Sequence, residues 1–228
     1  GLIKKIVRLF NRSISLSLSI SLTAVNNTEI TGAVFLDMKK AFYMVNQQIL
    51  LKKLAVYRVA PSAIAFFASY LANRHQRLYT NGKFSNAGMV KHGVPQGSIL
   101  GPLLFCLFIN DMPLSLSHPD VSCELFADDS TLHVSKPNEQ NISQILQQSI
   151  NEIMTWCNSN HMLLNPTKTK SMLITTRQKH QRKPQNLKLT LGSNVIEQVS
   201  KHRLLGVIVD DKLKWEPHID KICKMMSR

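Results

Sequence analysis

The chain has 228 residues, 44% of them hydrophobic, with 9 Gly and 9 Pro; this is a globular composition with room for one ample domain or a domain and a fragment. Lys and Arg number 28 against 14 Asp and Glu, and the formal charge of +14 favours a polyanionic partner, nucleic acid or an anionic membrane surface, with a generally basic solvated surface as the alternative. The longest apolar runs are too short to span a bilayer, which excludes a transmembrane segment. Residues 168–228 carry 14 of the basic side chains and are expected to bind phosphates more strongly than the rest of the chain.

The cysteines are widely spaced, show no CxxC pair and lie in apolar periodic segments. They are therefore expected to be reduced core thiols of an intracellular protein, not disulfides or zinc ligands. The four are Cys106, Cys123, Cys157 and Cys223.

The first 31 residues imitate a signal peptide, because basic residues precede the run SISLSLSISLTAV. The alternating serines make that run too polar for a signal, and its period of two fits a strand with one apolar face. The chain does not begin with Met, so residue 1 is expected to be a cut inside a longer polypeptide.

The next elements follow from periodicity. GAVFLD, 32–37, predicts a buried strand that delivers a carboxylate to the sheet edge. Residues 39–57 have helical spacing, and a second helix is expected to begin at Pro61, whose fixed φ suits a first turn. The pair Asn81-Gly82 between β-prone runs predicts a two-residue hairpin.

The second half alternates helices and strands. After the loop GVPQGS, residues 100–111 predict a buried helix, and 121–134 predicts a hairpin with Asp128 and Asp129 at its tip. An apolar stripe from Ile142 to Cys157 predicts a long helix, with Asn138 or Asn141 as the cap. Short strands are expected at SMLITT, LKLTL and LLGVIV, and residues 175–186 form the one clear basic exposed loop. This order indicates an α+β fold with helices on an antiparallel sheet.

The pair Asp128-Asp129 needs a cation. No Lys or Arg lies between Lys91 and Lys136, so nothing nearby in the sequence neutralises the two carboxylates. At a separation of about 4 Å and an effective dielectric near 20 they repel by roughly 4 kcal/mol. Successive residues of a straight strand point to opposite faces, so only a turn lets both serve one site.

Asp37 also ends a short strand, and if the two strands are neighbours, three carboxylates converge. Oxygen ligands alone suit Mg²⁺ or Mn²⁺, and two such ions can support phosphoryl transfer. On chemistry alone, most adjacent aspartates are solvated turn residues. Asp210-Asp211 is an internal comparison, since the lysines that follow it favour the solvated-turn interpretation there.

Five ordered motifs carry a resemblance to a known family: FLDMKKAF, GVPQGSILGPLLF, LFADDSTL, LNPTKTKSM and LLGVIVDDKLKWEPHI. Over residues 30–228 the chain resembles the reverse transcriptases of LINE-type (non-LTR) retrotransposons. The resemblance implies a polymerase-type palm, an antiparallel sheet covered by helices, with partial fingers and the start of the thumb. It implies three segments: 1–31 on the fingers side, 32–178 as palm with a fingers-side insertion, and 179–228 as the end of the palm and start of the thumb.

The resemblance also implies catalytic roles. Asp37, Asp128 and Asp129 match the catalytic, metal-binding aspartates, which would hold two Mg²⁺ (or Mn²⁺) ions. Lys168 matches a lysine near the triphosphate, a candidate proton donor to pyrophosphate, although a solvated lysine is the alternative.

Other matches concern the substrates. Phe42 matches the aromatic residue beneath the sugar of the incoming nucleotide, and Gln96 and Gly97 lie in the loop that contacts nucleotide and template. Leu205 and Gly206 match the hairpin that positions the primer end. The implied partners are an RNA template, a DNA primer and deoxynucleoside triphosphates, with no membrane.

Further positions match less specifically or depart. Arg74 and Gln76 match a recurrent stretch with a template or structural role, His218 is expected to make a helix-start hydrogen bond, and His133 is expected to be a satisfied core histidine. The departures are Tyr43, where the family usually has Asp, and Val45-Asn46-Gln47, where Val-Asp-His is common.

Three hypotheses follow. The first is an RNA-directed DNA polymerase fragment, from a retrotransposon polyprotein. The second is a basic remnant that binds nucleic acid but cannot polymerise, which the departures and the unrecognisable fingers segment favour. The third is an intron-encoded maturase, a related palm polymerase.

Overall fold

The structure is a computed structural model that describes residues 29–175 and 186–227. The strand expected in SISLSLSISL and nearly all of the basic loop expected at 175–186 lie outside these residues. The chain divides into two compact units. We call them the sheet unit (up to Asp37, 113–155 and 164 onward) and the helical unit (38–112 and 156–163).

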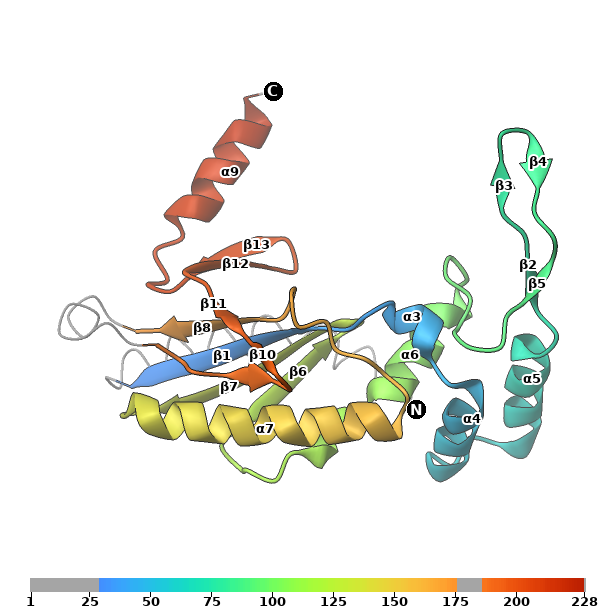
Figure 1. Cartoon of the computed structure of the whole chain (residues 1–228), viewed down its shortest axis with the longest axis horizontal. Helices are drawn as coiled ribbons and strands as arrows, with labels where there is room; N and C mark the ends of the chain where they lie inside the picture. The colour runs from blue at the N-terminus through green and yellow to red at the C-terminus, as the bar shows by residue number, and fades with distance from the viewer. Residues whose placement is uncertain (1–28, 176–185, 228) are drawn as a thin grey trace. The chain divides into compact units, whose positions relative to one another are not determined.

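A five-stranded sheet forms the centre of the sheet unit, in the order β11-β8-β1-β7-β6 (Figure 1). β1 lies in the middle and pairs antiparallel with both β7 and β8, as predicted, whereas the short edge strand β11 pairs parallel with β8. The strands are β1 (Ile30–Asp37), β6 (Ser122–Phe126), β7 (Asp129–Lys136), β8 (Lys170–Ile174) and β11 (Glu197–Gln198). The predicted strand at 32–37 and the predicted hairpin at 121–134 are confirmed.

The long helix α7 (Glu139–Ser159) covers one face of this sheet (Figure 1). Its buried stripe includes Ile142 and Leu146, and a Cβ at Gly32 would collide with both side chains. The Asn138 side chain accepts from the Gln140 amide and caps the helix start, so the predicted stripe and cap are confirmed. Glycine at position 32 is therefore what lets helix and strand approach so closely.

The opposite face of the sheet carries a second cluster. Because side chains alternate along a strand, Ala33 and Phe35 of β1 lie on the face away from Gly32, and they pack with Met172, Ile174 and Val209. Asp37 continues this row, so it emerges on the face that α7 does not cover.

The C-terminal part of the sheet unit consists of small hairpins and a helix: β9 (Thr190–Leu191), β10 (Asn194–Val195), β12 (Lys201–Leu204), β13 (Val207–Asp210) and α9 (Glu216–Met226). The expectation of one continuous strand in LLGVIV is wrong. Leu205 and Gly206 have φ of 48° and 90° and make a two-residue turn that folds the segment into a hairpin. In LKLTL only the last two residues are strand.

The helical unit contains four helices among the described residues: α3 (Ala41–Met44), α4 (Gln47–Val56), α5 (Pro61–Leu71) and α6 (Leu100–Ile109). The 3-10 turn η1 (Met112–Ser115) follows α6. The helix beginning at Pro61 and the buried apolar helix after GVPQGS are confirmed. One continuous helix over 39–57 is wrong, because the Asn46 side chain accepts from the amides of Gln48 and Ile49 at 3.0 and 3.1 Å and starts a new helix.

A hairpin extends from the end of α5 in two short ladders: β2 (His75–Gln76) with β5 (Gly88–Met89), and β3 (Tyr79–Thr80) with β4 (Lys83–Phe84). Its turn is Asn81-Gly82, with φ of 50° and 76°, so the predicted hairpin is confirmed.

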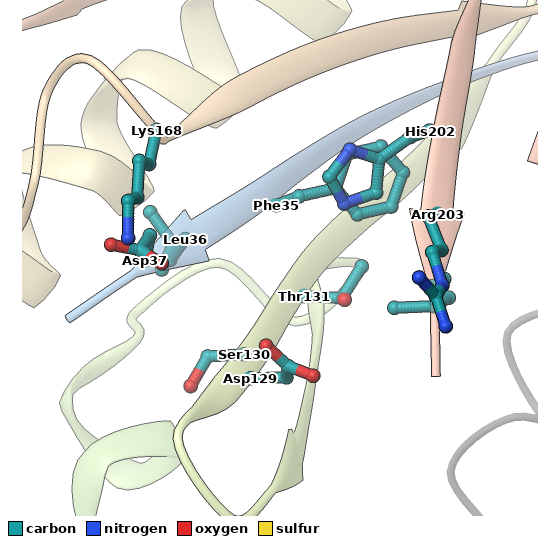
Figure 2. Close-up of a pocket in the computed structure, with 10 residues that line it drawn as sticks. Phe35, Leu36, Asp37, Asp129, Ser130, Thr131, Lys168, His202 and Arg203 are labelled. Carbon is teal, nitrogen blue, oxygen red and sulfur yellow. The ribbon is translucent and has the colours of Figure 1, made fainter. Parts of the chain in front are cut away.

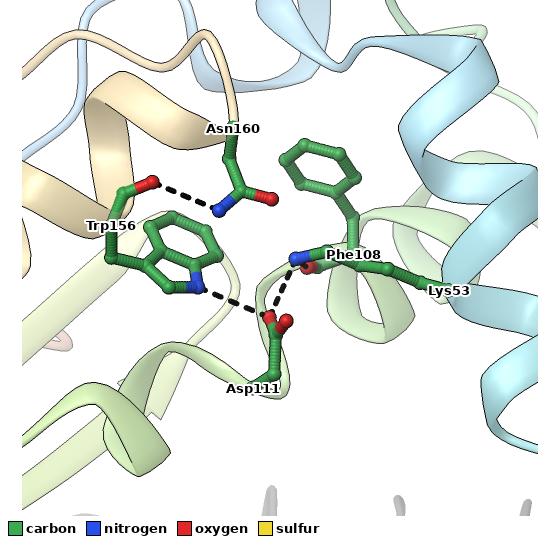
Figure 3. Close-up of polar contacts among 5 residues, drawn as sticks. All are labelled: Lys53, Phe108, Asp111, Trp156 and Asn160. Atoms are coloured by element: carbon green, nitrogen blue, oxygen red, sulfur yellow. Dashed lines mark hydrogen bonds and ion pairs between the residues drawn. The ribbon is translucent and has the colours of Figure 1, made fainter.

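A lysine is held inside the helical unit (Figure 3). Lys53 Nζ donates to Phe108 O at 2.7 Å and to Asp111 Oδ1 at 2.6 Å, and it lies 4.7 Å from the ring centres of both Phe108 and Trp156. The Trp156 indole donates to the same carboxylate at 3.3 Å. Burial lowers the Lys53 pKa although Asp111 opposes this shift, so the carboxylate and the two rings compensate only in part for the lost hydration.

The four cysteines are free thiols. Cys157 is buried and Cys106 and Cys123 are half-buried, but Cys223 is exposed on α9, so its expected core position is wrong. None of the helices in the described residues has the length and apolarity needed to cross a membrane.

Candidate active site

The hairpin of β6 and β7 presents the two adjacent aspartates. Phe126 pairs with Asp129 across the hairpin, so the turn consists of Ala127 and Asp128 alone. Ala127 has φ of 51°, in the left-handed region that costs a residue with a Cβ roughly 1–2 kcal/mol. Both aspartates are exposed, with Asp128 in the turn and Asp129 at the first position of β7.

Asp37 lies directly opposite Asp129 in the β1–β7 ladder. Residues directly opposite on antiparallel strands project to the same face of the sheet, about 4.5–5.5 Å apart at Cβ. The predicted adjacency of the strand of Asp37 and the hairpin is therefore confirmed, with Asp129 rather than Asp128 as the ladder partner.

The loop before β8 holds the end of β1 in place. The Asn165 amide donates to Asp37 O at 2.7 Å, and the Asp37 amide donates to Thr169 Oγ1 at 3.3 Å. Both partners belong to LNPTKTK, so this motif fixes the backbone of the first aspartate and brings Lys168 to the same place.

The electrostatics at Asp129 are unfavourable for an anion. Although Asp129 is exposed by surface area, partial desolvation of its carboxylate first, then the charges of Asp128 and Asp37, raise its pKa above the ordinary value. Within 29–175 and 186–227, neither lysine nor arginine forms an ion pair with any of the three carboxylates. In the same ranges no three His, Cys, Asp or Glu side chains are arranged to enclose a metal ion. The carboxylates are thus close enough to repel one another but do not form a closed ligand set.

A pocket opens beside Asp37 and Asp129 (Figure 2). Figure 2 shows the exposed Lys168 side chain directed toward Asp37, and His202 stacked on Phe35 with ring centres 3.9 Å apart. Burial and the nearby Lys170 lower the His202 pKa, which favours the neutral ring. The lining residues are Phe35, Leu36, Asp37, Asp129, Ser130, Thr131, Lys168, His202, Arg203 and Leu204.

His202, Arg203 and Thr131 are among the lining residues that the sequence did not single out. Only the β12 register brings the first two to this face, and no local motif marks them. Leu205 and Gly206 form the turn that directly follows Leu204, so the predicted primer hairpin begins at the wall of the pocket.

Asp210 is not the solvated turn residue expected. It is buried, and its carboxylate accepts from the amides of Lys212, Lys214 and Trp215. Its neighbour Asp211 is half-buried, and neither residue lines the pocket of Asp37 and Asp129.

One of the two histidines singled out from the sequence differs from expectation. His133 is buried, but neither ring nitrogen has a hydrogen-bond partner among the described residues, and Glu124 Oε2 lies 3.6 Å from its Nδ1. Burial lowers the His133 pKa to about 4, so the ring is neutral. The His218 ring accepts from the Ile208 amide at 3.4 Å and connects α9 to β13, while the His218 backbone amide donates to Trp215 O at 3.0 Å and makes the expected helix-start bond.

The GVPQGS loop belongs to the helical unit, where it binds the α3 segment. The amides of Gly93 and Val94 donate to the carbonyls of Val45 and Phe42, at 2.7 and 2.9 Å. Gly93 has φ of 87°, and a Cβ there would lie 2.9 Å from Phe42 O, so this position requires glycine. The sequence reasoning singled out Gly97 and missed this role of Gly93.

Of the predicted nucleotide residues, Phe42 takes part in that contact, and Gln96 and Gly97 follow it in the loop. Phe42 is half-buried and stacks on Phe105, with ring centres 4.6 Å apart. Gln96 and Gly97 are exposed; Gly97 has φ of 85° with open space where a Cβ would be.

Comparison with known proteins identifies the family. The family model described as reverse transcriptase (RNA-dependent DNA polymerase) matches residues 2–209. The chain belongs to the reverse transcriptase family. Its resemblance to the LINE-type group is confirmed by relatives among mobile elements. A probable RNA-directed DNA polymerase from transposon BS of Drosophila melanogaster is 29% identical over 87% of this chain, and one from mobile element jockey of Drosophila funebris is 26% identical over 89%.

This reverse transcriptase chain spans about a fifth of those relatives, 22% of each. Among solved structures, apo telomerase from Candida tropicalis truncated from its C-terminal domain matches with a TM-score of 0.57 and 14% identity, over 95% of this chain and 39% of that one. At this identity the likeness shows the fold alone.

Proposed function

We propose that the sheet unit is the palm of an RNA-directed DNA polymerase, a retrotransposon fragment that joins a deoxynucleotide to a primer on an RNA template. The observation that carries this proposal is the ladder pairing of Asp37 with Asp129, beside Asp128 in the turn. The family membership and the named polymerase activity of the relatives support it. The helical unit then supplies fingers-side residues, and α9 begins the thumb.

The carboxylates suit hard divalent cations. They are oxygen donors, they repel one another, and within the described residues no lysine or arginine forms an ion pair with them. Asp37, Asp128 and Asp129 would hold two Mg²⁺ or Mn²⁺ ions, which supply activation of a hydroxyl and stabilisation of a leaving pyrophosphate when bound. Substrate phosphates would have to complete the coordination, as is usual for Mg²⁺ sites.

The other residues act through position. Lys168 stands beside Asp37, where its ammonium could give a proton to the departing pyrophosphate oxygen. Phe42, which stacks on Phe105, would pack beneath the sugar of the nucleotide. Gln96 and Gly97 would contact the nucleotide and template. The tight Leu205-Gly206 turn would hold the primer end near the pocket.

Primer extension on an RNA template tests this function. Asp128→Asn keeps the size of the side chain but removes its charge, and we expect it to lower the rate at least about 100-fold. Asp211→Asn is the matched control, because it alters an adjacent aspartate outside the pocket, and it should leave the rate within about twofold. A chain that is equally inactive in all forms yet binds the template would instead be the non-catalytic remnant.

A further inference from the structure

The hairpin beyond α5 carries an exposed aromatic pair at its end. Tyr79 and Phe84 are directly opposite in the β3–β4 ladder, and their ring centres are 4.7 Å apart. The two residues are 63% and 68% exposed. The described residues therefore leave most of this double aromatic surface uncovered.

The local frame holds the two rings in register. The Asn81-Gly82 turn joins the strands, and the Ser85 amide donates to Leu78 O at 2.8 Å while the Leu78 amide donates to Ser85 Oγ at 2.9 Å. The aromatic pair is fixed by backbone bonds on both sides, which lowers the entropy lost when a ligand stacks on it.

The surrounding charge has one sign. Residues 38–110 contain nine Lys and Arg and no Asp or Glu. Arg77 and Lys83 flank the aromatic pair, and both are exposed. Such a segment complements a polyanion, and the small apolar area at the tip, bordered by Thr80 and Asn81, matches one or two stacked bases better than a membrane.

We propose that Tyr79 and Phe84 form a stacking platform for unpaired bases of a single-stranded nucleic acid, with Arg77 and Lys83 neutralising the neighbouring phosphates. Aromatic side chains beside basic residues bind single strands in this way without reading the sequence. That the bound strand is the template ahead of synthesis rests on the proposed function; the platform itself does not.

The test compares base-bearing with abasic oligonucleotides of the same length, in RNA and in DNA, by fluorescence anisotropy with the full chain and without nucleotides or Mg²⁺. The double variant Tyr79→Ala/Phe84→Ala should bind the base-bearing strand about tenfold more weakly and the abasic strand unchanged. If the double variant loses affinity equally for the base-bearing and the abasic strand, or for neither, the proposal is overturned. The RNA and DNA arms show which strand the platform prefers.

Three controls keep the result interpretable. Tyr79→Phe retains both rings and should bind like the parent, and Phe66→Ala removes an exposed ring of α5 that lies outside the platform and should do the same. Arg77→Gln/Lys83→Gln should weaken the binding of both the base-bearing and the abasic strand, and it should reduce the salt dependence of that binding. Sedimentation of the double variant must match the parent; dissociation of a dimer instead would mean that a second copy covers the rings.

The outcome is independent of catalysis. If Asp128→Asn abolishes primer extension but removal of the two rings does not weaken binding of the base-bearing strand, the polymerase function stands and the platform fails. If the rings couple to bases in a chain that never extends a primer, the platform stands and the polymerase function fails.

Discussion

Asp37 and Asp129 face each other across the central strand pair of the sheet, although 92 positions separate them in the chain. The ladder places both on the face that α7 leaves open, and the turn sets Asp128 beside them. Burial, and after it the negative charges of Asp128 and Asp37, raises the pKa of Asp129. The fold therefore concentrates negative charge at one point of a chain with a formal charge of +14.

The left-handed Ala127 at the hairpin tip predicts a stabilising substitution. Ala127→Gly should raise the free energy of unfolding by about 0.5 kcal/mol, because relief of roughly 1–2 kcal/mol of backbone strain exceeds the added entropy of the unfolded chain. Urea denaturation measures it. Ala87→Gly, at an exposed position with ordinary φ, is the control and should destabilise; equal losses for both would contradict the strain at Ala127.

Two glycines of the GVPQGS loop are expected to respond differently. Gly93→Ala should cost about 3 kcal/mol, because positive φ and contact with the α3 backbone act together. Gly97→Ala meets open space and should cost only about 1 kcal/mol, from its φ alone. Thermal unfolding of the two variants tests the difference, and similar losses would show that the loop does not pack on α3 as described.

The lysine inside the helical unit predicts a coupled pair. Lys53→Met leaves Asp111 with Trp156 alone and should destabilise by about 2 kcal/mol. Adding Asp111→Asn should recover part of the loss, since the uncompensated charge is gone. Lys52→Met, an exposed neighbour, should change stability by less than about 0.5 kcal/mol. A double variant as unstable as the sum of the singles would refute the coupling.

Buried His133 predicts an acid sensitivity. Its folded pKa of about 4 lies below the unfolded value near 6.5, so the unfolded chain binds the extra proton and stability falls as pH drops from about 6.5 toward 4. The loss should approach about 3 kcal/mol, and His133→Leu should remove it. Denaturation curves of the parent and the variant between these pH values measure the loss. If the stability of His133→Leu depends on pH as that of the parent does, the buried neutral ring is contradicted.

Much of the fold follows from local pattern. The strand before Asp37, the Asn81-Gly82 hairpin and the α7 stripe were predictable because turn chemistry and periodicity are properties of neighbouring residues. The break at Asn46 was not predicted, since apolar periodicity continues across it and only the side-chain cap reveals a new helix. The hairpin at Leu205-Gly206 followed from the family resemblance, while its composition alone indicated one strand.

The site was predictable in part for the same reason. The sequence predicted that Asp37 and the aspartate pair lie close together, because each ends a strand. The residue that pairs with Asp37 depends on the strand register, which the sequence does not reveal. His202 and Arg203 enter the pocket only through tertiary packing. Asp210 was mistaken for a solvated residue because the amides that it binds belong to its own turn, and composition cannot show that.

The raised pKa of Asp129 has a consequence for stability. Since its folded pKa exceeds the unfolded value near 3.9, the folded chain binds the proton more tightly, and stability falls as pH rises through that window. Without divalent ions at pH 7, Asp129→Asn should therefore melt at a higher temperature than the parent. Below the window, where Asp129 is protonated in both states, the difference should vanish.

Melting temperature at pH 7 with and without Mn²⁺, for the parent and for Asp129→Asn, tests the central claim most directly. A cation held by the three carboxylates binds the folded state, so Mn²⁺ should raise the melting temperature of the parent and raise that of Asp129→Asn much less, with Asp211→Asn behaving like the parent. Equal shifts in all three proteins would contradict a cation site at Asp37, Asp128 and Asp129.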